Sequence, residues 1–208
     1  MKKIMFVFLL VFILGCGITS NIIYDTEYSF KQGIIEINSI DTKHGITFDK
    51  PSSDIEYLNN ALVDFYALKN KFSLLKPSDD TNALMELINF RIFDLEANVQ
   101  LQLGNSYGGK GTVKNGFACN QRPYILAFAN YYNESAKTGF IAVEYLKELF
   151  RSYPENAALL DIRTSYPMIL NVSYEKIFNR ARNEARVMDF YCKDEIIDET
   201  DPFADLLG

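Results

Sequence analysis

The sequence predicts a mainly α-helical fold, a bundle of about five or six helices, with a small β-hairpin near the N-terminus as a possible addition. After residue 53, apolar residues recur at intervals of three and four, which is the period of an amphipathic helix. Prolines and cap-like Ser, Thr and Asp residues separate these runs. Hydrophobic residues make up 48% of the 208-residue chain. That share is enough to build a real core, and no internal repeat is visible.

The first helix is predicted to begin near Ser53. Ser53 and Glu56 have capping-box spacing after Pro51, so their side chains can satisfy the first backbone N–H groups of the helix. Pro77 ends the run, because proline lacks a backbone N–H. The apolar stripe of this helix consists of Leu58, Ala61, Leu62, Phe65, Leu68, Phe72 and Leu75.

A second helix is expected to follow Ser78 or Thr81 and to end at Gly104, which occupies the position of a C-cap. Four further helices are predicted, over residues 123–132, 140–153 and 154–166 and from a cap at Ser173. The inward residues of the last are Ile177, Phe178, Ala181, Ala185 and Met188. Its basic residues, Arg180, Arg182 and Arg186, are expected to face solvent.

The segments before and after the helical domain (residues 53–192) are predicted to differ from it. Residues 33–40 and 45–48 can pair as a hairpin across Asp41–His44, and the rest of residues 16–52 is expected to act as a tether. Residues 193–208 carry six acidic residues and end in "DPFADLLG". Such an acidic tail is usually solvated, and its apolar end could serve as a short docking peptide.

The N-terminus, "MKKIMFVFLLVFILGCGITSN", has the pattern of a signal peptide over residues 1–15. Lys2 and Lys3 form a positive region before the unbroken apolar run from Ile4 to Leu14. That run is too short for a membrane-spanning helix, which takes roughly 20 apolar residues. Its length and place are those of the apolar region of a signal peptide.

The end of this leader, Ile13-Leu14-Gly15-Cys16, resembles the lipobox of bacterial lipoproteins. The resemblance implies cleavage before Cys16 and attachment of diacylglycerol and an acyl chain such as palmitate to that residue. Several acyl chains exceed what stable membrane anchoring needs. Gly17 stands where aspartate would signal retention in the inner membrane. The expected location is therefore the outer membrane, with the periplasmic face favoured over the cell surface.

Charge and cysteine content narrow the classes of partner. Removing residues 1–15 takes away Lys2 and Lys3 and lowers the formal net charge from −6 to −8. An acidic surface argues against nucleic acid as a partner. Cys119 and Cys192 then remain as an even pair, which predicts a disulfide in an exported protein; two separate buried thiols are the alternative. With one histidine, these cysteines do not make a structural zinc site, so no metal is expected.

The stretch "LGNSYGGKGTVKNG", residues 103–116, is similar to a nucleotide-binding phosphate loop, and Gly-Lys-Gly-Thr looks like the version in adenylate kinases. Such a loop follows a β-strand and opens a helix. Here the preceding residues have helical period, and Asn-Gly and proline follow. We therefore expect a connection between helices and neither a nucleotide nor another cofactor.

Catalytic chemistry is not expected. His44 is the only histidine, and no partner can be assigned to it from the sequence. Cys119 has no histidine near it in the chain, so it is a weak nucleophile candidate. Without a nucleophile–base pair, the protein is predicted not to be an enzyme.

The function expected from these features is a non-enzymatic binding or assembly module, held in the envelope by the lipid on Cys16, that contacts another envelope protein. Tyr107, in the glycine-rich stretch, is the candidate partner-binding anchor, since tyrosine offers a large contact area with few rotamers. The alternative is an immunity or exclusion lipoprotein that neutralises a toxin or competitor. Residues from Phe117 through Cys119 into "PYILAFANYY" look like helical immunity proteins of type VI secretion.

Overall fold

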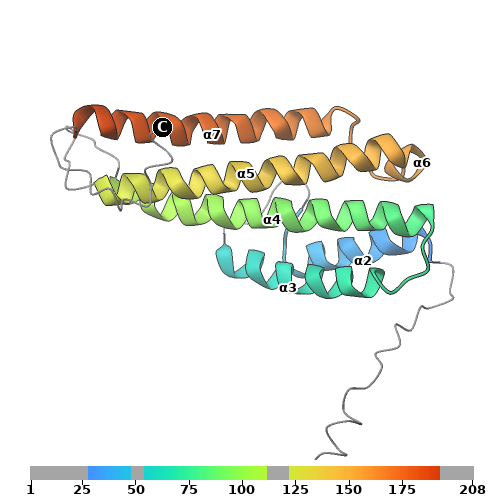
Figure 1. Ribbon diagram of the computed structural model, residues 1–208. Coiled ribbons are helices and arrows are strands. Elements are labelled where there is room, and N and C mark those ends of the chain that lie inside the picture. The colour runs from blue at the N-terminus through green and yellow to red at the C-terminus, as the bar shows by residue number, and fades with distance from the viewer. Residues whose placement is uncertain (1–27, 48–53, 112–121, 193–208) are drawn as a thin grey trace, which may run out of the picture.

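The computed structural model describes residues 28–47, 54–111 and 122–192 (Figure 1). Within these residues the chain forms helices and no strand, so the predicted helical bundle is confirmed. None of the helices in the described ranges is long and apolar enough to cross a membrane. The helices are α2 (Phe30–Lys43), α3 (Ile55–Phe72), α4 (Asp79–Gly111), α5 (Arg122–Ser152), α6 (Pro154–Ala157) and α7 (Tyr166–Tyr191).

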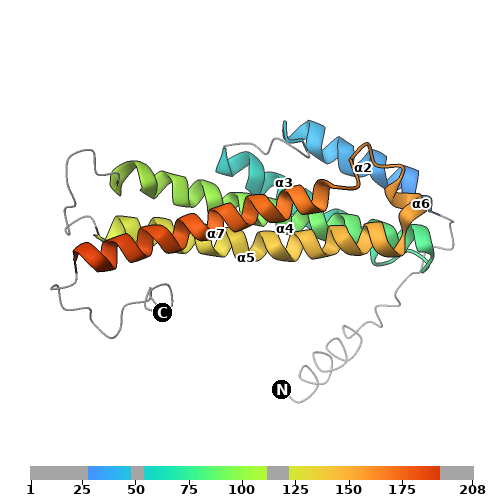
Figure 2. The ribbon, with the colours of Figure 1, turned by 90° about the horizontal axis from the view of Figure 1, so that it is seen from above.

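The two longest helices, α4 and α5, lie side by side and run in opposite directions. α7 lies along α5 on the side away from α4, and α2 and α3 lie on the other side of α4 (Figure 1). Figure 2, viewed from the side of α7, shows α7 following α5 along much of its length. Two helical layers therefore enclose α4, whereas α7 is an outermost helix.

The predicted hairpin near the N-terminus is wrong, because residues 30–43 form helix α2. Ser29 caps this helix, and Gln32 completes a capping box with it. Phe30, Ile37 and Asp41 are buried at helical spacing. The hairpin prediction took the short run of isoleucines as a strand, whereas the buried positions have the period of a helix. Part of the predicted tether thus belongs to the helical core.

The apolar stripe of helix α3 matches its prediction, but the predicted cap at Ser53 is wrong, because the N-cap residue is Asp54. Asp54 caps it, with its carboxylate accepting a hydrogen bond from the Glu56 N–H, and the helix ends at Phe72. Six residues of the predicted stripe are buried: Leu58, Ala61, Phe65, Leu68 and Phe72 within the helix, and Leu75 just after it. A stripe this regular determines both the helix and the face that it packs against α4.

The predicted end of the second helix at Gly104 is wrong, because α4 continues to Gly111. Gly104 and Gly108 lie one turn apart, against α5. A Cβ on Gly104 would lie 2.7 Å from the Tyr132 ring, and one on Gly108 would lie 2.9 Å from the Phe128 ring. These glycines therefore admit aromatic rings against the backbone of α4 and do not terminate the helix.

The two helices predicted over residues 123–132 and 140–153 are one continuous helix, α5. The intervening face remains buried because it is made of small or polar side chains that fit between helices: Asn133, Ser135, Ala136 and Gly139. Their low apolarity hid the helical period in the sequence.

The last helix begins before its predicted cap at Ser173. α7 starts at Tyr166, with Pro167 in its first turn, where proline is tolerated. The Ser173 hydroxyl donates to the Ile169 carbonyl within the helix. The short helix predicted over residues 154–166 is reduced to α6, Pro154–Ala157. Because α7 starts earlier than predicted, Met168, Ile169 and Val172 lie on a helix.

Candidate functional site

A buried chain of polar side chains connects three helices at the centre of the bundle. Arg91 of α4 donates a hydrogen bond to Asp41 of α2. Its guanidinium also lies 3.7 Å from the Asp94 carboxylate. The Tyr174 hydroxyl of α7 donates to Asp94 at 2.8 Å. The Asp41–Arg91–Asp94–Tyr174 chain therefore joins α2, α4 and α7.

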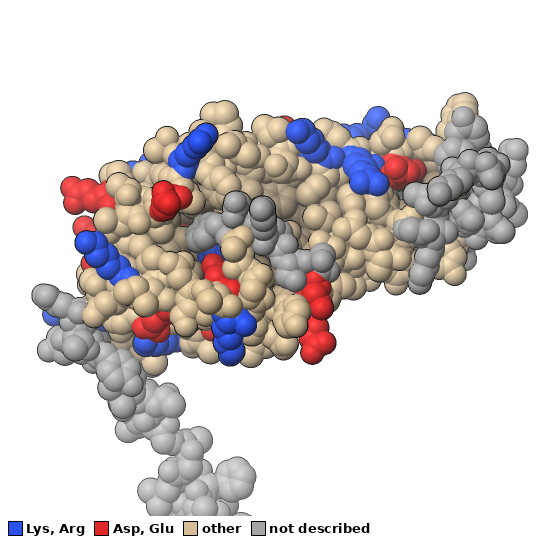
Figure 3. Space-filling view, turned by 180° about the vertical axis from the view of Figure 1, so that it is seen from behind, with Lys and Arg blue, Asp and Glu red and all other residues tan. Residues whose placement is uncertain are grey.

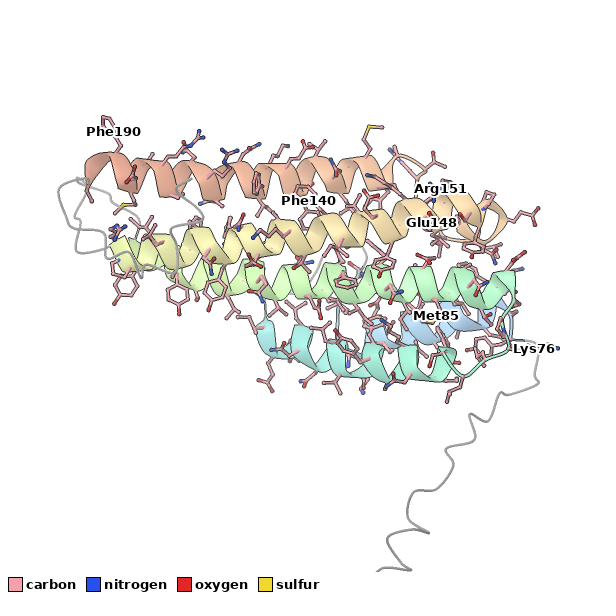
Figure 4. The ribbon with its side chains drawn as sticks, in the orientation of Figure 1. Lys76, Met85, Phe140, Glu148, Arg151 and Phe190 are labelled. Carbon is pink, nitrogen blue, oxygen red and sulfur yellow. The ribbon has the colours of Figure 1, made fainter. Side chains whose placement is uncertain are left out.

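Gly139 of α5 makes room for the last of these contacts. A Cβ at this position would lie 2.1 Å from the Tyr174 ring. With glycine there, Tyr174 reaches across α5 to Asp94 on α4. Phe140, which Figure 4 shows pointing from α5 toward α7, packs edge-on against the Tyr174 ring at 6.3 Å between centroids.

The electrostatics of this chain favour a structural role. Burial raises the pKa of Asp41 and of Asp94, and the Arg91 guanidinium acts in the opposite direction on both. Burial and the adjacent Asp94 carboxylate raise the pKa of Tyr174, so its hydroxyl remains a donor. Arg91 itself is 0% exposed. Because the charge of Arg91 is neutralised inside the protein, we infer that the Asp41–Arg91–Asp94–Tyr174 chain holds the helices together.

His44 has a partner that the sequence did not identify. Its Nε2 lies 2.7 Å from the Asp64 carboxylate of α3, and Lys43 donates to the same carboxylate at 2.6 Å. Hydrogen bonds from Lys43 and His44 lower the pKa of Asp64. The contacts of Lys43 and His44 with Asp64 hold the C-terminal end of α2 against α3.

Tyr107 lies on helix α4 and not in a loop. Its ring is half-buried and stacks on Tyr131 of α5, with 5.5 Å between centroids and 20° between planes. This packing commits part of the ring to the contact between helices. Its role as a partner-binding anchor stays a prediction.

Two of the three cysteines, Cys16 and Cys119, lie outside the described residues. Cys192 is 4% exposed, packs with Ile125 and Met188, and is disulfide-bonded. The predicted partner, Cys119, is among the residues not described, so the pairing itself stays a prediction. The lipidation of Cys16 likewise stays a prediction.

The first two turns of α7 carry exposed apolar side chains. Met168 is 70% exposed, Ile169 52% and Val172 43%. Beside them, between α5 and α7, lies a surface groove of about 470 Å³. Its lining residues are Lys147, Phe150, Arg151, Thr164, Pro167, Met168 and Asn171. Apolar side chains thus line an open groove where two helices meet.

Basic side chains continue this surface toward the C-terminal end of α7. Lys176, Arg182 and Arg186 are exposed, and no described carboxylate lies within ion-pair distance of them. Figure 3 shows separate Lys and Arg side chains over the upper part of the molecule, with Asp and Glu side chains among them. We call the exposed set Met168, Ile169, Val172, Lys176, Arg182 and Arg186 the outer face of α7.

Five surface cations on other elements have a carboxylate partner. These paired cations are Lys43, Lys71, Lys137, Lys147 and Arg151. The expectation that the arginines of the last helix face solvent holds for Arg180, Arg182 and Arg186. Arg180 differs in lying over the rings of Phe128 and Tyr132, at 5.1 and 5.3 Å from their centroids.

Sequence reasoning missed both the buried chain and the outer face of α7. Arg91 lies three residues after Ile88 and four before Leu95, so it falls within a core stripe. This position was the signal in the sequence that Arg91 is buried. Met168 and Val172 lie one helical turn apart after Pro167. The sequence predicts a start of the last helix at Ser173 and not at Tyr166, so it does not place these two residues on one helical face.

Comparison with protein-family models, with curated proteins and with solved structures gives no match. Among the described residues, no group of three or more His, Cys, Asp or Glu side chains is placed to hold a metal ion.

Proposed function

We propose that this chain is a membrane-anchored bacterial lipoprotein that acts as a non-enzymatic binding or assembly module in the cell envelope. Lipid on Cys16 holds it at the outer membrane. The helical bundle presents the outer face of α7 to another envelope protein, and the groove between α5 and α7 receives part of that partner.

The exposure of Met168, Ile169 and Val172 is the observation that carries this proposal. Exposed apolar side chains that cluster beside a groove are typical of protein interaction sites. Burying them gains roughly 25 cal/mol for each Å² of apolar surface removed from water. The groove adds Phe150 and Pro167, so a partner side chain can be enclosed there. Cations beside this patch would set the orientation of a partner.

The anchor is supported by the lipobox-like residues Ile13–Cys16 and by the charged and apolar leader before them. Labelling of cells with an alkyne fatty acid tests it. We expect label on the wild-type chain and none on Cys16→Ser. Equal labelling of the two proteins would contradict lipidation at this residue.

The binding surface is tested by the double variant Met168→Asp, Val172→Asp, which places two charges in the apolar patch. A matched control is Ile35→Asp, Val63→Asp, because Ile35 and Val63 are 68% and 67% exposed on α2 and α3. Proteins crosslinked to each variant in intact membranes are identified by mass spectrometry. We expect the first variant to lose a partner that wild type and the control retain.

Equal recovery of that partner by all three proteins would refute the role of the outer face of α7. Turnover of a substrate by the purified wild-type chain would refute a purely binding role. A toxin as the recovered partner would assign the module to immunity, whereas a structural envelope protein would assign it to assembly.

A further inference from the structure

We propose that the envelope partner places one acidic, amphipathic helix along the exposed side of α7. The inference rests on the proposed function and specifies the partner of that surface. The partner segment is a helix of about six turns, apolar at both ends and rich in Asp and Glu between them. The exposed residues of α7 indicate such a partner through their spacing, their charge and the length that they cover.

Exposed residues of α7 form one continuous stripe along the helix. We call it the docking stripe, and it consists of Ile169, Val172, Lys176, Asn179, Asn183, Arg186 and Phe190. Successive members are three and four residues apart in alternation, which is the spacing that keeps two helices in contact as a left-handed coiled coil. A helix presents side chains and no unpaired strand edge, so a β-strand cannot be added to it. The occupant that fits this stripe is therefore a second helix.

Apolar side chains lie at both ends of the docking stripe. Ile169 and Val172 are 52% and 43% exposed at the first end, and Phe190 is 72% exposed at the other. Figure 4 shows Phe190 pointing away from α5. The groove between α5 and α7 adjoins the first end, with Pro167 and Met168 among its lining residues. A partner helix can thus bury an apolar side chain at each end of the stripe.

The middle of the docking stripe is basic, although the whole chain has a formal net charge of −6. The exposed charged residues of α7 are four cations, Lys176, Arg180, Arg182 and Arg186, and one acid, Glu175. A partner with complementary charge carries Asp and Glu opposite these cations. A second copy of this chain would bring the same cations together, and like charges across an interface disfavour association. The charge of this surface therefore favours an acidic helix over a second α7.

The docking stripe also determines the length of the partner helix. Ile169 and Phe190 are 21 residues apart. At a rise of 1.5 Å per residue, they are separated by about 32 Å along the axis of α7, so a partner helix needs roughly 21 residues to contact both. An extended chain rises about 3.3 Å per residue and would cover the same length in about 10 residues. The separation of the two contact points in the partner sequence therefore distinguishes a helix from an extended segment.

Photo-crosslinking from both ends of the docking stripe tests the proposal in cells that produce the full chain. Benzoylphenylalanine replaces Ile169 in one protein and Phe190 in another, and mass spectrometry locates the crosslinked residues of the partner. We expect both positions to crosslink to the same envelope protein, at sites roughly 21 residues apart in a segment rich in Asp and Glu. Sites about 10 residues apart would indicate an extended segment and would overturn the proposal.

Two double charge reversals test the role of the cations. Arg182→Glu, Arg186→Glu should lower the crosslinking yield at position 169 about five-fold or more, because repulsion replaces exposed ion pairs. Lys31→Glu, Lys137→Glu makes the same change in net charge on α2 and α5 and should leave the yield unchanged. Replacing two acids of the crosslinked partner segment by arginine should restore the yield of the first variant. Circular dichroism of each purified variant establishes that it is folded.

Failure of this proposal and failure of the proposed function give different results. A yield that is independent of Arg182→Glu, Arg186→Glu, or that falls equally in both double reversals, would overturn the acidic helix and leave the binding surface intact. Different proteins at the two positions, or crosslinks to lipid or to a second copy of this chain, would also overturn the acidic helix. No crosslinked protein at either position would contradict the proposed function itself.

Discussion

Helices α4 and α7 both carry arginine, and they use it in opposite ways. Arg91 of α4 is fully buried, and the carboxylates of Asp41 and Asp94 neutralise it. Arg182 and Arg186 of α7 are exposed and have no carboxylate partner among the described residues. The difference lies in position, since among the described helices α4 has neighbours on two sides and α7 on one (Figure 1).

The contrast between the arginines of α4 and α7 distinguishes residues that stabilise the fold from residues that are available to contact a partner. A buried charge cannot be left without its partner except at a large cost in stability. An exposed charge is solvated, so its loss changes association more than folding. Substitutions on α4 should therefore lower the free energy of unfolding, whereas substitutions on the outer face of α7 should leave it nearly unchanged.

The largest effect is expected from Arg91→Met. Methionine keeps much of the volume but leaves Asp41 and Asp94 buried without a cation, which should cost about 3 to 5 kcal/mol of unfolding free energy. Urea unfolding followed by circular dichroism measures it. Arg151→Met is the matched control, because Arg151 is exposed on α5 and should change stability by about 0.5 kcal/mol or less. Similar losses of unfolding free energy in both variants would refute the distinction between buried and exposed arginines.

Gly139→Ala should have the next largest effect. The added Cβ would overlap the Tyr174 ring, so α7 must move or Tyr174 must release Asp94. Overpacking of this kind costs about 1 to 3 kcal/mol. Lys137→Ala, an exposed position on the same helix, is the control and should be close to neutral. A stability of Gly139→Ala equal to that of the control would contradict the close contact between α5 and Tyr174.

Asp94→Asn should change the pH dependence of stability. Burial raises the pKa of Asp94 above its ordinary value of 3.8, so the folded protein keeps this proton after the unfolded chain has lost it. The contribution of Asp94 to stability therefore falls as the pH rises from 3.8 through the raised pKa. Relative to wild type, Asp94→Asn should become more stable over that rise. Parallel stability curves for the two proteins would contradict the raised pKa.

The smallest effect on stability is expected on the outer face of α7. Met168→Asp, Val172→Asp removes no buried contact, so its unfolding free energy should stay within about 0.5 kcal/mol per substitution of wild type. The same urea titration measures it. A loss of unfolding free energy as large as that of Arg91→Met would show that this surface stabilises the fold. It would contradict the distinction between α4 and α7.

The sequence was sufficient where one helix buries one regular apolar stripe. Leu58 to Phe72 predicted α3 and its buried face correctly, and the helical class followed from such stripes. It was insufficient where helices pack through small residues. Gly104 has the appearance of a C-cap, and Gly139 separates two apolar runs, yet both glycines lie inside helices against aromatic rings.

The candidate sites were harder to predict, because they depend on residues far apart in the chain. Asp41 and Arg91 meet only after α2 packs on α4, and nothing local to either residue indicates the other. The exposure of Met168 depends on the start of α7 at Tyr166 and on the absence of a described helix over its outer side. Periodicity identifies a buried face but not which exposed face remains uncovered.

Photo-crosslinking in cells that produce the full chain tests whether the outer face of α7 binds another envelope protein. Benzoylphenylalanine is placed at position 168 on α7 in one protein and at position 63 on α3 in another, because Met168 and Val63 are both about equally exposed. We expect position 168 to yield a specific crosslink to one envelope protein and position 63 to yield none. No protein crosslinked at position 168, or the same products from both positions, would contradict a binding role for the outer face of α7.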